Sequence, residues 1–529
     1  MFPSTLSENS ASKRLFTHSR LALAAIILIA SAGLSQAQAP VRAGGSLPAL
    51  GDTSELAASA ERRLGDRIAS SIYRDPDYLD DPVLGDYLQG IWQPLMTAAR
   101  ARGELGAELE ERFAWDIMLI RNRTVNAFAL PGGYLGVHLG LISVVETRDE
   151  LASVLAHELT HVTQRHISRL MSKQNQQMPW LLAAMILGMM AASKNPDAAN
   201  AAIAGGQAMA VQNQLNFSRD MEREADRIGF GVMADAGYDQ QGFASMFDKL
   251  QQASRLNDNG SYPYLRSHPL TTERIGEAKS RLQLEGSAPT AVSAEAGRAR
   301  LVHAMMAGRA RVLGNSSAEA LRLALTEAQR VTAAVLAPRD VGALYAGALA
   351  ASRLREHSQA RSLADKLQTA AAASPAMTQA LELLTLEIDI AAGRATQAAR
   401  LSSVNSRAAM LLQSQADLAA GRPQDVSERL QTWVSTHPRD AMAWQLLATA
   451  QGRQGQTLRA IRSDAESRVA QLDYGAARDR FKAAQDLMRS GRDTGSGASA
   501  HIDGSIIDTR TREIEQLLRE QALQEKLDR

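Results

Sequence analysis

The fold is decided by the stretch TRDELASVLAHELTHV, residues 147–162. Thr147 and Glu150 have the spacing of a capping box, which predicts a helix that begins at Arg148. Apolar residues then recur at intervals of four, four and three, which is typical of a helix with one face in a core. The residues of this apolar stripe are Leu151, Leu155, Leu159 and Val162.

A metal-binding pattern, His157-Glu158-Leu159-Thr160-His161, lies on the same predicted helix. His157 and His161 are four residues apart, so their imidazoles lie one above the other and can both reach one metal ion. Glu158 is turned by about 100° from His157, which places its carboxylate beside the metal and not on it. On pattern alone, the alternative is a capped helix with surface histidines.

A third ligand separates two classes of metal site. The extended metzincin pattern would require glycine and histidine where this chain has Gln164 and Ile167, so that pattern fails. A later helix offers Glu222, with Asp226 one turn further along. Two histidines and one glutamate leave zinc an open position for water, which is the catalytic arrangement. His166 would be turned about 140° away from His161 on a continuous helix, so it is interpreted as structural.

An extended segment upstream, residues 126–133, ends in the turn Pro131-Gly132-Gly133. Such a segment can form the edge strand of a sheet, against which a peptide substrate adds by backbone hydrogen bonds. The alternative is a simple internal hairpin. The predicted substrate-binding strand consists of Asn126, Ala127, Phe128 and Ala129.

Composition limits the class of protein. At 529 residues the chain is long enough for several units. It carries 58 Lys and Arg against 57 Asp and Glu, so it has no basic field for a nucleic acid partner. Aromatic residues make up only 4%, which favours long helices. No cysteine is present, so disulfides and thiolate-bound zinc are excluded.

The N-terminus is typical of a targeting segment. Lys13, Arg14 and Arg20 precede the apolar run from Leu21 to Leu34, and small residues follow. We expect a signal peptide over residues 1–37, cleaved after Ala37, with a linker over 38–50. A retained membrane anchor is disfavoured because the run is shorter than the ~20 residues that span a bilayer. The mature protein is expected in the periplasm.

The C-terminal half is rich in Ala, Leu, Arg and Gln, and helix breaks recur near His357, Gly393, Gly421 and Gly455. A spacing near 34 residues predicts helix-turn-helix repeats, and residues 443–448 resemble the first helix of a tetratricopeptide (TPR) repeat. Such pairs stack into an α-solenoid whose concave side binds polypeptides. An ordinary helical bundle is the alternative. We place the TPR-like repeat domain at 286–491 and a linker with a solvated terminal helix at 492–529.

The zinc pattern, the segment Glu222-Arg223-Glu224-Ala225-Asp226 and the stretch Asn126 to Gly133 resemble the peptidase family of the CAAX prenyl proteases and the HtpX heat-shock peptidases. The resemblance implies a mainly α fold: an α+β gluzincin-type zinc peptidase domain with a small β-sheet, at 51–285, followed by the solenoid. It implies one Zn²⁺ held by His157, His161 and Glu222.

The resemblance also assigns catalysis to Glu158 and implies that Asp226 accepts the distal N–H of a ligand imidazole. It brings His268 near the metal, either in the open position of a resting state or assisting the reaction. Arg274 takes a supporting role beside it. With an export signal and repeats, the resemblance implies polypeptide substrates, namely misfolded or stalled outer-membrane β-barrel proteins, and docking of the repeats on the β-barrel assembly machinery.

Two further expectations concern function. The apolar insert at 179–192 is either a buried hairpin or a Met-rich patch that touches membrane, substrate or partner. The rival to an endopeptidase is a non-proteolytic chaperone or assembly factor that works through its repeats. A membrane-embedded prenyl-protein protease is disfavoured, because the sequence has no set of long apolar spans.

Overall fold

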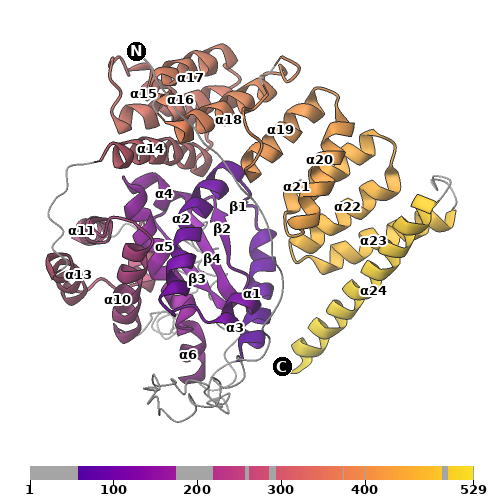
Figure 1. Ribbon diagram of the computed structural model, residues 1–529, viewed down its shortest axis with the longest axis horizontal. Coiled ribbons are helices and arrows are strands. Elements are labelled where there is room, and N and C mark those ends of the chain that lie inside the picture. Colours follow the sequence, from indigo (N-terminus) through magenta and orange to yellow (C-terminus); the bar gives the residue numbers. More distant parts are fainter. Residues whose placement is uncertain are drawn as a thin grey trace, which may run out of the picture. The chain divides into compact units, whose positions relative to one another are not determined.

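The computed structural model describes residues 57–173, 219–255, 261–284, 293–372, 374–397, 400–490 and 498–527. The predicted signal peptide, the linker at 38–50, the apolar insert at 179–192 and residues 492–497 lie outside these ranges. The described chain is mainly helical with one small sheet, as predicted (Figure 1). None of its described helices is both long and apolar enough to cross a membrane.

The first half of the chain contains all the described strands. Its elements are α1 (Ala58–Tyr73), β1 (Tyr78–Leu79), α2 (Pro82–Ala101), α3 (Ala107–Arg112), β2 (Asp116–Ile120), β3 (Ala127–Leu130), the 3-10 turn η1 (Pro131–Gly133), β4 (Tyr134–His138), α4 (Leu139–Val144), α5 (Arg148–Thr163), α6 (His166–Lys173), α10 (Arg219–Asp235), α11 (Gln241–Arg255), α12 (Tyr264–Ser267) and α13 (Thr272–Leu284).

The four strands form one mixed sheet in the order β1-β2-β4-β3. β2 runs parallel to β4, whereas β3 is antiparallel to β4 and pairs Phe128 with Gly136. β3 lies at an edge of this sheet and contains Ala127, Phe128 and Ala129 of the predicted strand, whereas Asn126 precedes it. That a substrate binds here stays a prediction. The neighbour of β3 across the sheet face is α5, which packs against this strand.

The helices α5 and α10 lie side by side and carry the predicted ligands. α5 begins at Arg148 with Thr147 as its N-cap, as predicted. The close approach depends on Gly229 of α10, since a Cβ there would lie 3.1 Å from the Ala156 carbonyl oxygen. A larger residue would push α10 away from α5, and with it the side chain of Glu222.

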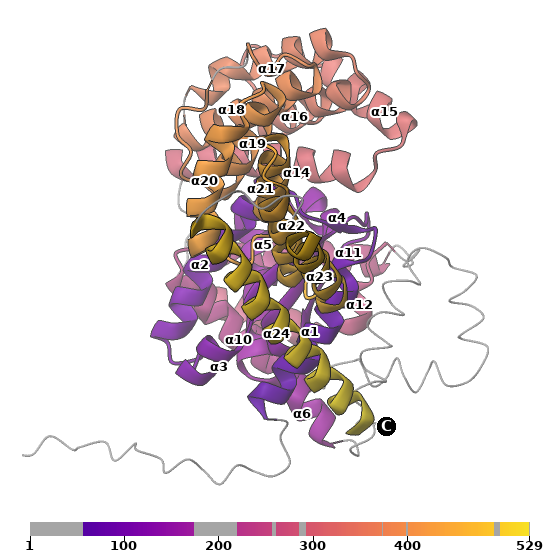
Figure 2. The same ribbon diagram turned by 90° about the vertical axis from the view of Figure 1, so that its right-hand side faces the viewer.

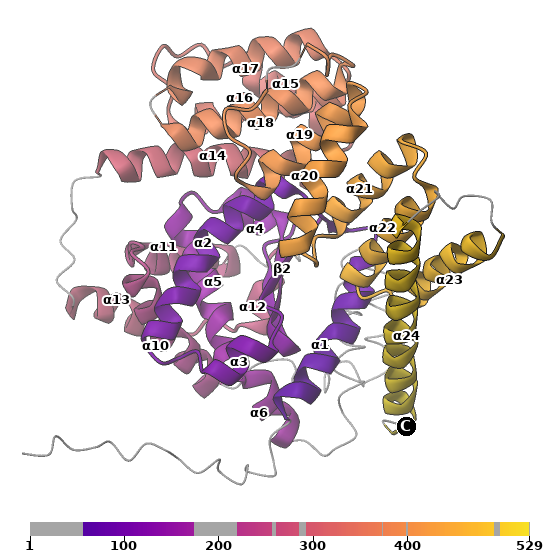
Figure 3. The ribbon, with the colours of Figure 1, turned by 45° about the vertical axis from the view of Figure 1, so that its right-hand side comes forward.

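The second half of the described chain is entirely helical, and from α16 onward each helix packs against the next (Figures 2 and 3). Left-handed glycines lie two residues after the ends of α18, α19 and α21, at the predicted breaks. That these helices are TPR repeats stays a prediction. The helices are α14 (Ala294–Gly314), α15 (Ala318–Gln329), α16 (Pro338–Arg353), α17 (His357–Ala371), α18 (Pro375–Ala391), α19 (Arg407–Ala419), α20 (Pro423–Thr436), α21 (Ala441–Arg453), α22 (Thr457–Ala470), α23 (Tyr474–Ser490) and α24 (Ala498–Leu527).

The terminal helix differs from the expectation of a solvated element. Ile507 and Ile514 of α24 are fully buried and belong to the same hydrophobic cluster as Phe481 of α23. Arg510 also pairs with Glu466 of α22 at 2.7 Å. In the sequence, charged residues lie between these isoleucines, so the apolar face of the helix is hard to recognise.

One hydrophobic cluster continues across residue 285, the predicted domain boundary. It contains Trp92 of α2, Leu155 of α5 and Met305 of α14. A buried ion pair reinforces this contact, because Arg309 of α14 binds both carboxylate oxygens of Asp81, the N-cap of α2, at 2.7 and 2.8 Å. The position of the domain boundary therefore stays a prediction.

Candidate metal centre

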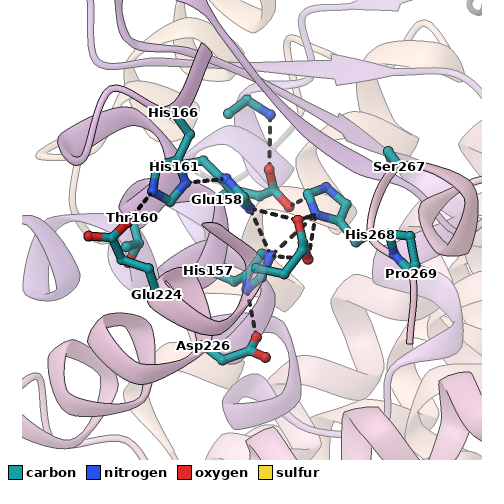
Figure 4. A network of polar contacts seen from close by, with 12 residues as sticks. His157, Glu158, Thr160, His161, His166, Glu224, Asp226, Ser267, His268 and Pro269 are labelled. Atoms are coloured by element: carbon teal, nitrogen blue, oxygen red, sulfur yellow. Dashed lines mark hydrogen bonds and ion pairs between the residues drawn. The ribbon is translucent and has the colours of Figure 1, made fainter. Parts of the chain in front are cut away.

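Four buried side chains converge beside the junction of α5 and α10 (Figure 4). His157, His161 and Glu222 come from these two helices, and His268 follows the short helix α12. One ligand atom from each residue lies within 4.8 Å of those of the other three. The structure thus brings together the three predicted ligands and adds His268 as a fourth donor.

The donor atoms surround a common point. His157 Nε2 and His161 Nε2 lie 2.9 Å apart, and the Glu222 carboxylate oxygens lie 3.5 Å from each of these nitrogens. His268 Nδ1 lies 3.3 Å from His157 Nε2 and 3.0 Å from Glu222 Oε1. Such a convergence of imidazole and carboxylate donors can hold a metal ion.

Behind His157 lies an ionic network on α10 and α13. His157 Nδ1 is 3.0 Å from Asp226 Oδ1, and Arg274 donates to both Asp226 oxygens at 2.6 and 2.8 Å. Arg274 also pairs with Glu222 at 2.9 Å. Asp226 therefore lies where an acceptor for the distal N–H of His157 is expected, and Arg274 fixes the orientation of both carboxylates.

Titration of this network follows from burial and charge. Burial lowers the pKa of His157, but the hydrogen bonds to Asp226 and Glu222 outweigh it and raise that pKa to about 9. Burial raises the pKa of the Glu222 carboxyl, but His268 and His157 hold it well below its ordinary value. Without a metal the cluster therefore attracts a proton, as expected of a site that suits a cation.

Behind His161 lies a residue whose place the sequence interpretation missed. His166 is not turned away, because α5 ends at Thr163 and Arg165 adopts a left-handed conformation with φ of 52°. The turn brings His166 Nδ1 to 2.8 Å from His161 Nδ1. The direction of a side chain can be counted at 100° per residue only within one continuous helix, and α5 ends before His166. Burial lowers the pKa of His166 to about 4, which keeps its imidazole neutral near neutral pH.

Glu158 lies beside the metal-binding group and is fully buried. Its Oε2 accepts a hydrogen bond of 2.9 Å from the backbone N–H of Ala129, so the edge strand holds this carboxylate directly. Its Oε1 lies 3.3 Å from His268 Nε2 and forms no hydrogen bond within the described part of the chain. A buried carboxylate oxygen with spare accepting capacity suits a base that receives a water proton.

The segment around His268 is tied to the start of the edge strand. The Val125 N–H donates to the Ser261 carbonyl at 2.8 Å, and the Tyr264 N–H donates to the Val125 carbonyl at 3.3 Å. The Tyr264 ring stacks on the His268 imidazole with centroids 4.5 Å apart. These contacts link the position of the His268 imidazole to the residues that precede β3.

Comparisons with known proteins agree with this geometry. Residues 91–282, which include every ligand candidate, match the model of peptidase family M48. The beta-barrel assembly-enhancing protease of Yersinia pestis is 28% identical over 429 residues, 80% of this chain and 83% of that protein. Its counterpart from Escherichia coli K12 is also 28% identical, over 77% of this chain and 80% of that protein.

Two other relatives match a shorter part of the chain. A Vibrio cholerae relative is 34% identical over 237 residues, 44% of this chain, and the match spans 47% of that relative's length. The mitochondrial metalloendopeptidase OMA1 of Arabidopsis thaliana is 31% identical over 164 residues, 31% of each chain. The chain therefore resembles the beta-barrel assembly-enhancing proteases, and its residues 91–282 are similar to peptidase family M48.

Proposed function

We propose that the protein is a zinc-dependent endopeptidase that acts in the assembly and quality control of outer-membrane β-barrel proteins. The observation that supports this most is the convergence of His157, His161 and Glu222 beside the buried carboxylate of Glu158. The names of the similar bacterial proteins support the substrate class.

The donor set favours zinc among the metals. Tetrahedral ligands about 2.0–2.1 Å from a zinc ion lie about 3.3 Å from one another. The distances between the Nε2 atoms of the two helical histidines and the Glu222 oxygens run from 2.9 to 3.5 Å. Imidazole and carboxylate donors in this number suit zinc, whereas magnesium and calcium prefer shells of oxygen.

The residues around the site divide the chemical work. When bound, zinc would polarise the scissile carbonyl and lower the pKa of an attacking water. Glu158 takes the proton of that water and passes it to the leaving amine, because its carboxylate is buried beside the donors. Peptide substrate adds to β3 by backbone hydrogen bonds, which orients the scissile bond with little dependence on side chains.

The proposal is tested by metal analysis and casein cleavage. We expect the purified protein to contain about one zinc per chain and to cleave casein, and His157→Ala to lose both. His501→Ala changes an exposed histidine of α24 and should lose neither. Casein cleavage that persists in the zinc-free His157→Ala protein would overturn the proposal.

We also propose that His268 closes the site in a resting state. His268 Nδ1 lies within 3.3 Å of two ligand candidates, where a fourth donor would exclude water. His268→Ala should therefore raise the initial rate of casein cleavage several-fold without loss of zinc. A lower rate with zinc retained would mean that His268 assists the reaction instead of restraining it.

Zinc binding should depend on pH through His157. The hydrogen bonds to Asp226 and Glu222 outweigh burial and raise the pKa of His157 in the metal-free protein to about 9, so zinc must displace a proton below that pH. We expect zinc affinity to rise about tenfold per pH unit from 7 to 9 and then level off, measured by chelator competition. In Asp226→Asn the levelling should move to lower pH. An affinity independent of pH in the wild-type protein would contradict this.

The proposed function also implies a location in the cell and a role for each part of the chain. We propose a periplasmic location after cleavage of residues 1–37, a peptidase domain at 51–285 and TPR-like repeats at 286–491 that dock on the β-barrel assembly machinery. The insert at 179–192 is proposed to contact a membrane surface or substrate, on the basis of its sequence. Likeness to the bacterial relatives over about four fifths of the chain supports these assignments.

A further inference from the structure

A relay of polar contacts runs from His161 to the surface of α10 (Figure 4). His166 Nδ1 lies 2.8 Å from His161 Nδ1, and His166 Nε2 lies 3.1 Å from Glu224 Oε2. Arg169 donates to the same Glu224 oxygen at 2.8 Å. His166 is fully buried, whereas the Glu224 side chain is 27% exposed. The relay joins α5, α6 and α10 on the side of the site away from His268.

The donor and acceptor roles along this relay follow from the chemistry of imidazole. His161 directs Nε2 at the other donors, so in the neutral ring the hydrogen is on Nδ1. His166 must therefore accept at Nδ1 and carry its own hydrogen at Nε2, which donates to the Glu224 carboxylate. Each atom in the relay then has one compatible role, and the His161 ring cannot turn without breaking the first hydrogen bond.

The backbone that presents His166 carries a further sign of constraint. Arg165, a residue with a Cβ, is held at φ of 52°, a left-handed conformation that is unfavourable for residues other than glycine. Its guanidinium donates to Glu61 of α1 at 3.0 and 3.1 Å, which holds this turn in place. A continuous helix without this strain would direct His166 away from His161.

We propose that His166 and Glu224 are positioning residues that fix the imidazole of His161 for metal binding. This inference rests on the proposed metal site and deepens it. The two helical histidines are then oriented by different means: His157 by the Asp226 carboxylate directly, and His161 by the Glu224 carboxylate through the imidazole of His166. Partners of this kind commonly change metal affinity by about 10–100-fold.

The test measures zinc affinity by competition with a chelating dye, together with the visible absorption of the Co²⁺-loaded protein. His166→Phe keeps an aromatic ring but removes both nitrogens, so we expect zinc to bind about 10–100-fold more weakly and the cobalt spectrum to change. His166→Asn keeps an oxygen acceptor near the Nδ1 position and should recover most of the affinity. His303→Phe removes another buried imidazole, which contacts Tyr87 and Val145, and should leave zinc affinity unchanged.

Glu224 provides a second, independent test, because its side chain is partly exposed whereas His166 is fully buried. Glu224→Ala should weaken zinc binding in the wild-type background and have no further effect in His166→Phe, since it acts through that imidazole. Wild-type zinc affinity in both His166→Phe and Glu224→Ala would overturn the inference and leave the metal site intact. A wild-type protein that binds no zinc would overturn the proposed function as well.

Discussion

Replacing Glu158 by glutamine should lower the rate of cleavage by about 10³-fold and leave zinc in place. Glutamine has the size of glutamate and can still accept the hydrogen bond from the Ala129 N–H, so the buried site keeps its shape. It cannot take a proton from water, and general bases of this kind contribute about 10²–10⁴-fold to the rate. We expect kcat on casein to fall by about 10³-fold with zinc content unchanged.

A surface substitution provides the control. Glu108→Gln changes an exposed glutamate on α3 and should leave both kcat and zinc content unchanged. Substantial cleavage by Glu158→Gln would show that another group activates water. If cells that carry only Glu158→Gln still assemble outer-membrane proteins normally, the alternative of a non-proteolytic assembly factor gains the advantage.

The largest expected effect on stability concerns the buried ion pair of Asp81 and Arg309. The two side chains are only 7% and 3% exposed, and Arg309 donates to both Asp81 oxygens. Arg309→Met would leave the Asp81 carboxylate buried without its partner, which typically costs 3–5 kcal/mol. We expect this loss, of about 3–5 kcal/mol, in the free energy of unfolding from urea denaturation.

Two further variants distinguish loss of the pair from loss of packing. Adding Asp81→Asn to Arg309→Met removes the uncompensated charge but keeps the cap on α2, so most of the lost stability should return. On the same helix, Arg311 forms an exposed pair with Glu327, and Arg311→Met should cost at most about 1 kcal/mol. If Arg309→Met and Arg311→Met lowered the free energy of unfolding equally, burial would not explain the contribution of the Asp81–Arg309 pair.

Much of the fold could be predicted because local signals were strong. Thr147 and Glu150 predicted the start of α5, and left-handed glycines such as Gly421 and Gly455 follow helices at predicted breaks. The packing of α24 could not be predicted in the same way. Its two buried isoleucines are separated by charged residues, and the contacts with Phe481 and Glu466 show which face is covered.

The site could be predicted where one regular helix determined the geometry. His157 and His161 are one turn apart on α5, so their convergence followed from helical spacing alone. The place of His166 could not be found in this way, because it depends on the left-handed turn at Arg165. The sequence contained one signal for this contact, because His166 follows His161 by only five residues.

The most direct measurement is the anomalous diffraction of crystals of the full chain at the zinc absorption edge. We expect one peak about 2.0–2.1 Å from the Nε2 atoms of His157 and His161, with a Glu222 carboxylate oxygen as a third neighbour. A peak that lies elsewhere, or zinc bound by the two imidazoles with Glu222 directed away, would contradict the assignment of a catalytic metal centre.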